Sequence, residues 1–274
     1  MQASAETLVA RVLATRAATV RLTEPLAIED WSAQSMPDAS PAKWHLAHTT
    51  WFFDRFVLRP LGVEPITPAS VPSCTHAGAY DYLFNSYYDS VGTRQPRPRR
   101  GMLTRPTVAE VLAYRRAVDL RLADLAGSSQ LPAIAAALEL GVNHEEQHQE
   151  LLLTDLKHLF AQSPLAPAYR APVATEVAPR ASIPLEWRSF DGGLVEIGHH
   201  GRSFSFDNER PRHKVFVGPF EIASRLVTCE EYLRFVEDGG YRRPELWLSD
   251  GWHWLSSGKE RSGSELAPLY WDLP

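Results

Sequence analysis

The sequence changes its character at residue 163, and this change constrains the fold more than any other feature. Residues 163–184 read SPLAPAYRAPVATEVAPRASIP and contain five prolines, a composition typical of an extended, semi-rigid linker. Segments with helical periodicity precede the linker, and short segments with strand-like alternation follow it. The sequence therefore predicts two domains, residues 1–162 and 185–274, and a chain of 274 residues is long enough to give each a core.

The segments before the linker repeat apolar residues at intervals of three and four, as amphipathic helices do. The first of these helices is predicted over residues 5–23. The second has Ser40 as its candidate N-cap and Pro41 at its first helical position, and it continues through Leu58.

Two further helices complete this domain. One begins at Thr107, where Glu110 completes a capping box, and it ends at Gly127. The other begins near Pro132 and continues past Phe160. Four helices with apolar stripes imply an antiparallel bundle, in which sites are built from the side chains of facing helices.

The region after the linker has short alternating segments around Gly-Gly and Gly-Pro turns, in RSFDGGLVEIGHHG and HKVFVGPFEIASRLVT. Thr228 and Glu231 have the spacing of a capping box at the start of a short helix, and glycines follow at its end. The second domain is therefore predicted to be α+β.

Charge and composition exclude several classes of protein. A net charge of -5 and a pI near 6.1 argue against nucleic-acid binding, which requires a basic surface. No apolar run approaches the roughly 20 residues that span a bilayer. Two cysteines, Cys74 and Cys229, give no disulfide framework, so the sequence predicts unpaired thiols and a cytoplasmic protein.

The motif HEEQH places His144 and His148 on one face of a helix, because four residues turn through about 400°. This spacing suits one metal ion, although a solvated face rich in Glu and Gln would show the same pattern. On the second helix, His48 falls near the centre of an aromatic stripe and His45 closer to its edge. The wheel favours His48 over His45 only slightly. Three neutral imidazoles from two helices would leave coordination positions open, as in a catalytic metal site.

HEEQH also matches the H-E-x-x-H pattern of zinc metalloproteases, with Glu145 as the general base. The third ligand of such enzymes usually lies downstream. Downstream of His148 this chain has only the linker and a strand-rich region, so a metalloprotease is a minor alternative.

Stretches from both domains resemble the ergothioneine-biosynthesis sulfoxide synthases, the EgtB-type enzymes. In the first domain they are SPAKWHLAHTTWFFDRF, YDYLFNSYYDSVG, RPRRGMLTRPTVAEVLAYRRAVD and NHEEQHQELLLTDLKH. The segment from Ile197 to Leu255 resembles the first half of the formylglycine-generating-enzyme-like module of that family. The resemblance covers nearly the whole chain, in the same domain order.

The resemblance implies a DinB-like four-helix bundle followed by a C-type-lectin-like domain. It implies a non-haem Fe(II) held by His48, His144 and His148, the positions that match the family motifs. Gln147 matches a family position that helps to hold the imidazole substrate near the iron.

The reaction that the resemblance implies joins a thiol to C2 of the imidazole of hercynine, with O2, and gives a sulfoxide. The thiol is cysteine or γ-glutamylcysteine, and a related branch, the selenoneine synthases, inserts selenium from a seleno-sugar. The arginines before the third helix are natural partners for substrate carboxylates, and the sequence does not assign them individually: Arg94, Arg97, Arg99 and Arg100.

The sequence ends at APLYWDLP, part-way through the second module of the family. The tyrosine that donates a proton in the family is therefore expected to lie beyond the end of this sequence, as is most of the substrate-ammonium pocket. An alternative from another class is a DinB-like metal protein, either a thiol transferase that uses Zn2+ or Ni2+ or a binding protein.

Overall fold

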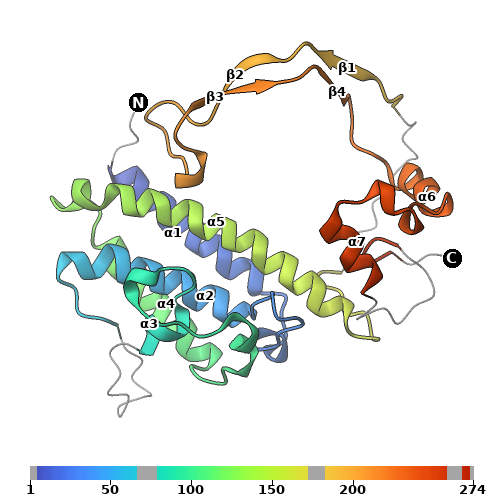
Figure 1. Ribbon diagram of the computed structural model, residues 1–274. Coiled ribbons are helices and arrows are strands. Elements are labelled where there is room, and N and C mark those ends of the chain that lie inside the picture. Colours follow the sequence, from blue (N-terminus) through green and yellow to red (C-terminus); the bar gives the residue numbers. More distant parts are fainter. Residues whose placement is uncertain (1–4, 67–78, 172–182, 258–266, 272–274) are drawn as a thin grey trace. The chain divides into compact units, whose positions relative to one another are not determined.

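The structure is a computed structural model that describes residues 5–66, 79–171, 183–257 and 267–271 (Figure 1). The chain divides into two compact units, Met1–Ala174 and Thr175–Pro274, and this division falls inside the predicted linker. The first unit is helical and the second contains strands and short helices. The predicted order, a helical domain followed by an α+β domain, is confirmed.

Four long helices form the bundle of the first unit. They are α1 (Ala5–Thr23), α2 (Ala42–Phe53), α4 (Val108–Ala123) and α5 (Leu131–Ala161). Helix α5 packs against α1 and α2, and α4 packs against the other side of the same two helices (Figure 1). One apolar core fills the space between the four helices. Helices α2 and α5 are neighbours in this bundle.

The start of α2 differs from the prediction, because Pro41 rather than Ser40 is the N-cap. The proline ring fixes φ at -60° but leaves ψ at an extended 149°, and the Pro41 carbonyl accepts the N–H groups of Trp44 and His45. The Ser40 hydroxyl is instead used in a tertiary contact, since it accepts a hydrogen bond from Arg100 at 2.9 Å.

The helical backbone of α2 continues beyond its last α-helical residue. A π-helical turn, η2 (Asp54–Leu58), and a 3-10 turn, η3 (Arg59–Leu61), extend it past the predicted end at Leu58. Gly62 then ends the helix in the left-handed region, at φ 80°, where a side chain would be strained.

Helix α4 begins with the predicted capping box. The Thr107 hydroxyl accepts the Glu110 N–H at 3.3 Å, and a Glu110 carboxylate oxygen accepts the Thr107 N–H at 2.5 Å. The helix ends at Ala123, four residues before the predicted end, and a turn leads to Gly127 at φ 75°. Helix α5 begins at Leu131, next to the predicted Pro132.

We expect Thr107→Ala to lower the free energy of unfolding of the first unit by about 1 kcal/mol, because the capping oxygen is lost. Urea denaturation followed by far-UV circular dichroism measures this change. Thr104→Ala is the matched control, since Thr104 is exposed and precedes the helix. Equal stability of the two variants would contradict the capping assignment.

Short elements connect η3 to α4 and carry the arginine cluster. They are α3 (Ala79–Phe84), η4 (Asp89–Val91) and η5 (Arg97–Met102), and a further 3-10 turn, η1 (Ile28–Trp31), lies between α1 and α2. Lys43 links α2 to the end of η5, because its ammonium donates a hydrogen bond of 2.7 Å to the carbonyl of Leu103, the residue that follows η5.

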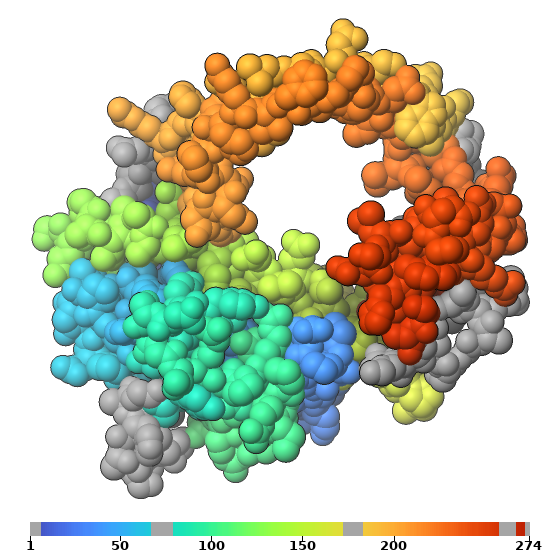
Figure 2. Space-filling view, viewed as in Figure 1, coloured from blue at the N-terminus to red at the C-terminus, as the bar shows by residue number. Residues whose placement is uncertain are grey.

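The described residues of the second unit form two antiparallel strand pairs, β1 (Trp187–Phe190) with β4 (Phe220–Ala223) and β2 (Gly193–Ile197) with β3 (His213–Val217). The side chains of these strands form a narrow band in the space-filling view (Figure 2). Large apolar side chains on them are exposed, for example 75% for Phe216 and 63% for Trp187. Helices α6 (Cys229–Glu237) and α7 (Ser249–Ser256) follow the strands. A 3-10 turn at Asp207–Glu209 lies between β2 and β3, and those at Gly240–Arg242 and Pro244–Leu246 lie between the two helices.

Three sequence predictions for this part of the chain can be compared with the structure. Thr228 and Glu231 form the predicted capping box of α6. Cys229 has a free, exposed thiol as predicted, whereas Cys74 lies outside the described residues. Among the described residues, no helix combines the length and apolar character needed to cross a membrane.

Candidate metal centre

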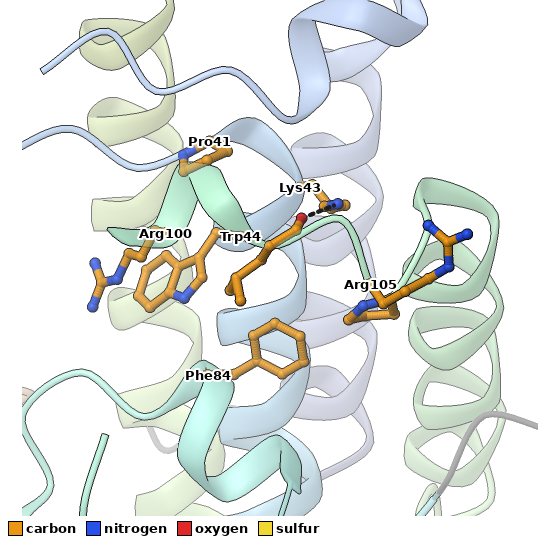
Figure 3. A pocket seen from close by; sticks show the side chains of 8 residues that line it. Pro41, Lys43, Trp44, Phe84, Arg100 and Arg105 are labelled. Carbon is orange, nitrogen blue, oxygen red and sulfur yellow. Dashed lines mark hydrogen bonds between the residues drawn. The ribbon is translucent and has the colours of Figure 1, made fainter. Parts of the chain in front are cut away.

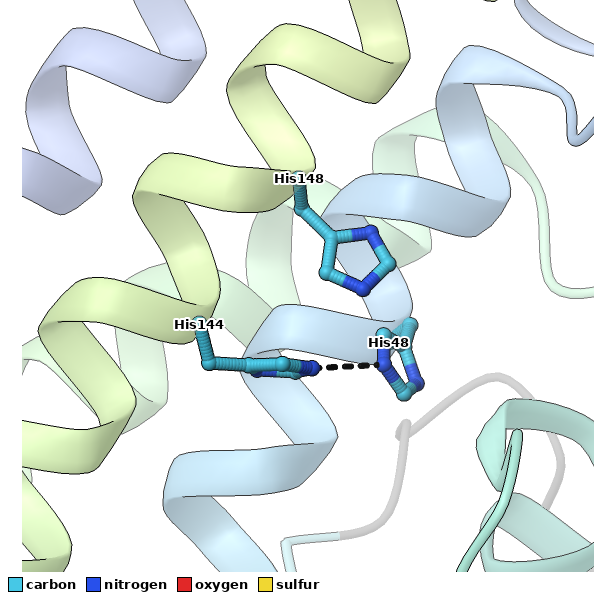
Figure 4. A group of neighbouring side chains, drawn as sticks. All are labelled: His48, His144 and His148. Atoms are coloured by element: carbon cyan, nitrogen blue, oxygen red, sulfur yellow. Dashed lines mark hydrogen bonds between the residues drawn. The ribbon is translucent and has the colours of Figure 1, made fainter. Parts of the chain in front are cut away.

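Three histidine side chains converge where α2 and α5 face each other. His48 projects from α2, and His144 and His148 project from successive turns of α5 (Figure 4). One ring nitrogen from each lies within 4.8 Å of the other two. The structure thus brings together the three residues predicted as ligands, and their binding of a metal stays a proposal.

The hydrogen bond of His48 determines which of its nitrogens can bind a metal. Its Nδ1 lies 2.5 Å from the Phe84 carbonyl oxygen, which can only accept, so Nδ1 carries the proton. Nε2 therefore presents a lone pair, and it lies 3.1 Å from Nε2 of His144. Two nitrogens bound to one ion at about 2.1 Å would lie roughly 3.0–3.4 Å apart. The spacing of this pair fits two ligands of one metal.

Burial keeps the three imidazoles neutral. It lowers the pKa of His48 and of His148 well below the usual value, with a further contribution from the neighbouring histidines. Burial also lowers the pKa of His144 to about 4. The neutral ring is the form that binds a metal. His144 Nδ1 is buried and has no hydrogen-bond partner among the described residues.

Aromatic rings hold His48 and His144 in place. The indole of Trp44 stacks on the His48 imidazole, with ring centres 4.6 Å apart and planes within 10°. Trp51 packs on the same imidazole at 5.9 Å, and Phe52 lies 4.8 Å from the His144 ring. The crowded aromatic residues of α2 therefore limit the rotamers of the two histidines.

His45, which the helical wheel placed closer to the edge of the stripe, is buried, with 2% of its surface accessible. Its Nδ1 lies 2.9 Å from Nδ1 of His148, and its Nε2 lies 3.0 Å from a carboxylate oxygen of Asp155. It does not belong to the converging group. Burial lowers the pKa of His45, although Asp155 opposes this shift.

A cavity of about 410 Å³ opens in front of the three histidines. Besides them, it is lined by Gln147, by two arginines and by side chains from α2, α5 and the loops beside them: Asp38, Ser40, Trp44, His45, Ser86, Tyr87, Tyr88, Arg97, Arg100, Leu151 and Asp155. The predicted substrate residues Gln147, Arg97 and Arg100 therefore share a cavity with the histidines.

The other two predicted arginines lie elsewhere. Arg94 is exposed and pairs with Asp89 at 2.5 Å, and Arg99 is exposed; neither lines the cavity. Arg97 is held at the cavity by a hydrogen bond to the Tyr87 hydroxyl. The structure thus separates the cluster into two arginines that reach the cavity and two that do not.

Arg100 is a buried cation without a carboxylate partner among the described residues. Its guanidinium lies 3.4 Å from the ring centre of Trp44 (Figure 3). It also donates hydrogen bonds to the hydroxyls of Ser40 and Ser86. Its Nε has no partner in the described part of the chain. Burial, followed by the nearby charge of Arg97, lowers the pKa of Arg100 to about 9. An anion in the cavity would relieve the cost of this unpaired charge.

Glu145 lies in the bundle core, where α5 faces α1 and α4, and it does not line the cavity. Its carboxylate is fully buried and accepts hydrogen bonds from Arg115, from Arg16 at 3.3 Å and from Thr19 at 2.6 Å. Burial alone would raise the pKa of Glu145, but the two guanidinium groups hold it below its usual value. A carboxylate bound in this way cannot activate a water at the histidines, which argues against the metalloprotease alternative.

Sequence reasoning missed Asp155 as a part of the site. A signal was present, because Asp155 follows His148 by seven residues, or two turns of the same helix face. Ser40 and Ser86, which bind Arg100, carried no such signal, since their contacts depend on how the loops fold.

Residues 11–152 of the chain match the DinB superfamily. The chain belongs to the DinB superfamily. Residues 176–270 of this DinB protein match the sulfatase-modifying factor enzyme 1-like domain, so the predicted pair of domains is confirmed. The three-histidine group lies entirely within the DinB region.

Several named proteins are similar to this chain. A hercynine oxygenase of Mycobacterium tuberculosis is 28% identical over 271 residues, 98% of this chain and 58% of the relative. One from Mycolicibacterium thermoresistibile is 26% identical over 238 residues, 86% of this chain and 48% of the relative. Ergothioneine biosynthesis protein 1 of Neurospora crassa is 27% identical over 175 residues, 58% of this chain and 20% of the relative.

These likenesses confirm the predicted membership of the EgtB-type family. The chain spans about half the length of the bacterial relatives that it matches.

Proposed function

We propose that this DinB protein is a non-haem Fe(II), O2-dependent sulfoxide synthase of ergothioneine biosynthesis. It would join the sulfur of cysteine or γ-glutamylcysteine to C2 of the hercynine imidazole. One thiol, one hercynine and one O2 would give one sulfoxide and one water. The observation that carries the proposal is the group of three neutral histidines opening onto a cavity that also contains an unpaired, buried arginine.

His48, His144 and His148 would hold the metal through Nε2 of at least the first two, leaving coordination positions toward the cavity. Iron in this site would supply redox chemistry with O2 and a place for the thiolate, which Zn2+ on the same nitrogens could not. The chain's own residues would bind and orient the two organic substrates, which removes much of the entropic cost of their encounter.

Gln147 and the two cavity arginines suit different substrates, because their side chains differ in charge and hydrogen bonding. The Gln147 amide can both donate and accept, so it suits the imidazole ring of hercynine beside His148. Arg97 and Arg100 carry positive charge at the same cavity, so they suit the carboxylate of the thiol donor.

The complete gene product, loaded with Fe(II) without oxygen, is the material for the test. It is mixed with hercynine and one donor, and O2 is then admitted while oxygen uptake and product mass are followed. Cysteine, γ-glutamylcysteine and a seleno-sugar are tried separately, so a selenoneine synthase would be recognised by product from the last alone. Absence of oxygen uptake and of a C–S or C–Se product with every donor would reject the proposal.

We expect Arg100→Gln to raise KM for the thiol donor about 10- to 100-fold while KM for hercynine stays unchanged, because a charged hydrogen bond is worth about 1.5–3 kcal/mol. Steady-state oxygen uptake with each substrate varied in turn measures this split. Arg99→Gln is the matched control, because Arg99 is the residue next to Arg100 and its side chain is exposed and lies outside the cavity. Thermal unfolding of both variants identifies any loss of fold.

A further inference from the structure

A chain of hydrogen bonds leads from the third candidate ligand to a carboxylate two turns further along α5. Nδ1 of His148 lies 2.9 Å from Nδ1 of His45, and Nε2 of His45 lies 3.0 Å from Oδ2 of Asp155. The Ser40 backbone N–H donates to the same Oδ2 at 2.8 Å, which fixes the carboxylate from a second side.

The protons of this chain can be placed from the chemistry of its ends. The ionised Asp155 carboxylate only accepts, so Nε2 of His45 carries a proton and donates it. Nδ1 of a neutral His45 then has a lone pair and must accept from Nδ1–H of His148. Nε2 of His148 is therefore unprotonated, and it points toward His48 and His144 (Figure 4).

We propose that Asp155 and His45 are positioning residues that hold His148 in the one tautomer able to bind a metal through Nε2. The inference rests on the proposed metal site but not on the reaction that follows. Partners of this kind fix the orientation and basicity of ligand imidazoles, and their loss costs about 10–100-fold in metal affinity.

Removal of the charge of Asp155 would weaken or reverse this series of hydrogen bonds. The Ser40 N–H and Nε2 of His45 share one oxygen, Oδ2, so in Asp155→Asn a single atom of the amide takes its place. An amide oxygen there is a neutral, weaker acceptor for the Nε2–H of His45, whereas an amide NH2 group there would donate to Nε2 of His45. In the second arrangement His45 carries its proton on Nδ1 and donates to Nδ1 of His148, so the proton of His148 moves to Nε2 and blocks the metal. His45→Phe keeps a ring of similar size in the buried space but removes the acceptor for His148.

The test is titration of the metal-free protein with Co2+, read from its visible absorption and from competition with a chelator. We expect Asp155→Asn and His45→Phe to bind Co2+ about 10–100-fold more weakly and to shift the absorption bands. Asp38→Asn is the matched control, because it removes a carboxylate from the same cavity without a bond to His45 or His148. It should bind Co2+ as the unaltered protein does.

Two results would overturn the inference. One is unchanged Co2+ affinity and spectrum in both variants while thermal unfolding shows them folded; lower thermal stability alone would then mark the pair as packing residues. The other is an equal loss of affinity in Asp38→Asn, which would indicate a general effect of charge. His144→Ala is measured alongside: if it also binds Co2+ normally, the metal site itself is wrong, and otherwise only the role of the pair is at stake.

Discussion

His144→Ala should abolish stoichiometric metal binding, the largest functional loss expected of any single substitution in this chain. His144 supplies one of the two nitrogens that face each other at 3.1 Å. Without it, only the imidazoles of His48 and His148 would remain to bind the metal. We expect metal affinity to fall by more than about 100-fold, beyond the loss of about 10–100-fold that follows removal of a supporting partner. Elemental analysis of freshly purified protein and titration with Co2+ measure the change.

The control for this variant is on the same helix. His158→Ala removes a histidine whose Nδ1 contacts the Ser35 hydroxyl at 2.7 Å and which does not line the cavity. It should retain one metal per chain. Retention of one tightly bound metal in His144→Ala would show that the three histidines are not the metal site. Iron in the unaltered protein would favour the oxygenase over a Zn2+- or Ni2+-dependent thiol transferase.

Local sequence rules predicted the helices of the bundle because each has a local signal. The apolar repeat located α1 and α5 within a residue or two, and the capping box located the start of α4. The N-cap of α2 was missed because Pro41 and Ser40 can both precede a helix, and tertiary packing decided between them. Ser40 contacts Arg100, a residue 60 positions away, and a local pattern cannot show such a contact.

The candidate site was predictable where its residues share one helix and unpredictable where they meet across loops. The spacing of His144 and His148 follows from helix geometry alone. The wheel separated His48 from His45 only slightly, because both are buried and the difference lies in what each contacts. The sequence did not show which arginines of the cluster reach the cavity. This depends on a 3-10 turn, which directs Arg100 into the cavity and leaves Arg99 exposed.

Gly141 shows how a packing requirement can be hidden in a sequence. A Cβ at this position would lie 2.6 Å from the ring of Phe53, so the absence of a side chain lets α5 approach α2 closely. The approach occurs one turn before His144. The glycine therefore helps to bring the histidines of the two helices within reach of one another, although in the sequence it is only a poor helix former.

Glu145→Ala should destabilise the first unit by about 3–5 kcal/mol, the largest loss of stability expected from one substitution here. The variant would leave the guanidinium groups of Arg115 and Arg16 in the bundle core without the carboxylate that they share. Arg16 would keep a contact with Asp119, but Arg115 would have no charged partner among the described residues. Urea denaturation of the metal-free protein measures the loss without a contribution from bound metal.

Glu146→Ala is the matched control, because Glu146 is the next residue on α5 and its pair with Arg11 is exposed and 3.9 Å long. An exposed pair contributes about 0–1 kcal/mol, so this variant should unfold almost as the unaltered protein does. A metalloprotease makes the opposite prediction for Glu145→Ala, namely unchanged stability and loss of hydrolysis. Unchanged stability would therefore remove the structural role assigned to Glu145. The expected instability would instead identify it as the buried carboxylate that links α5 to α1 and α4 in the core of the bundle.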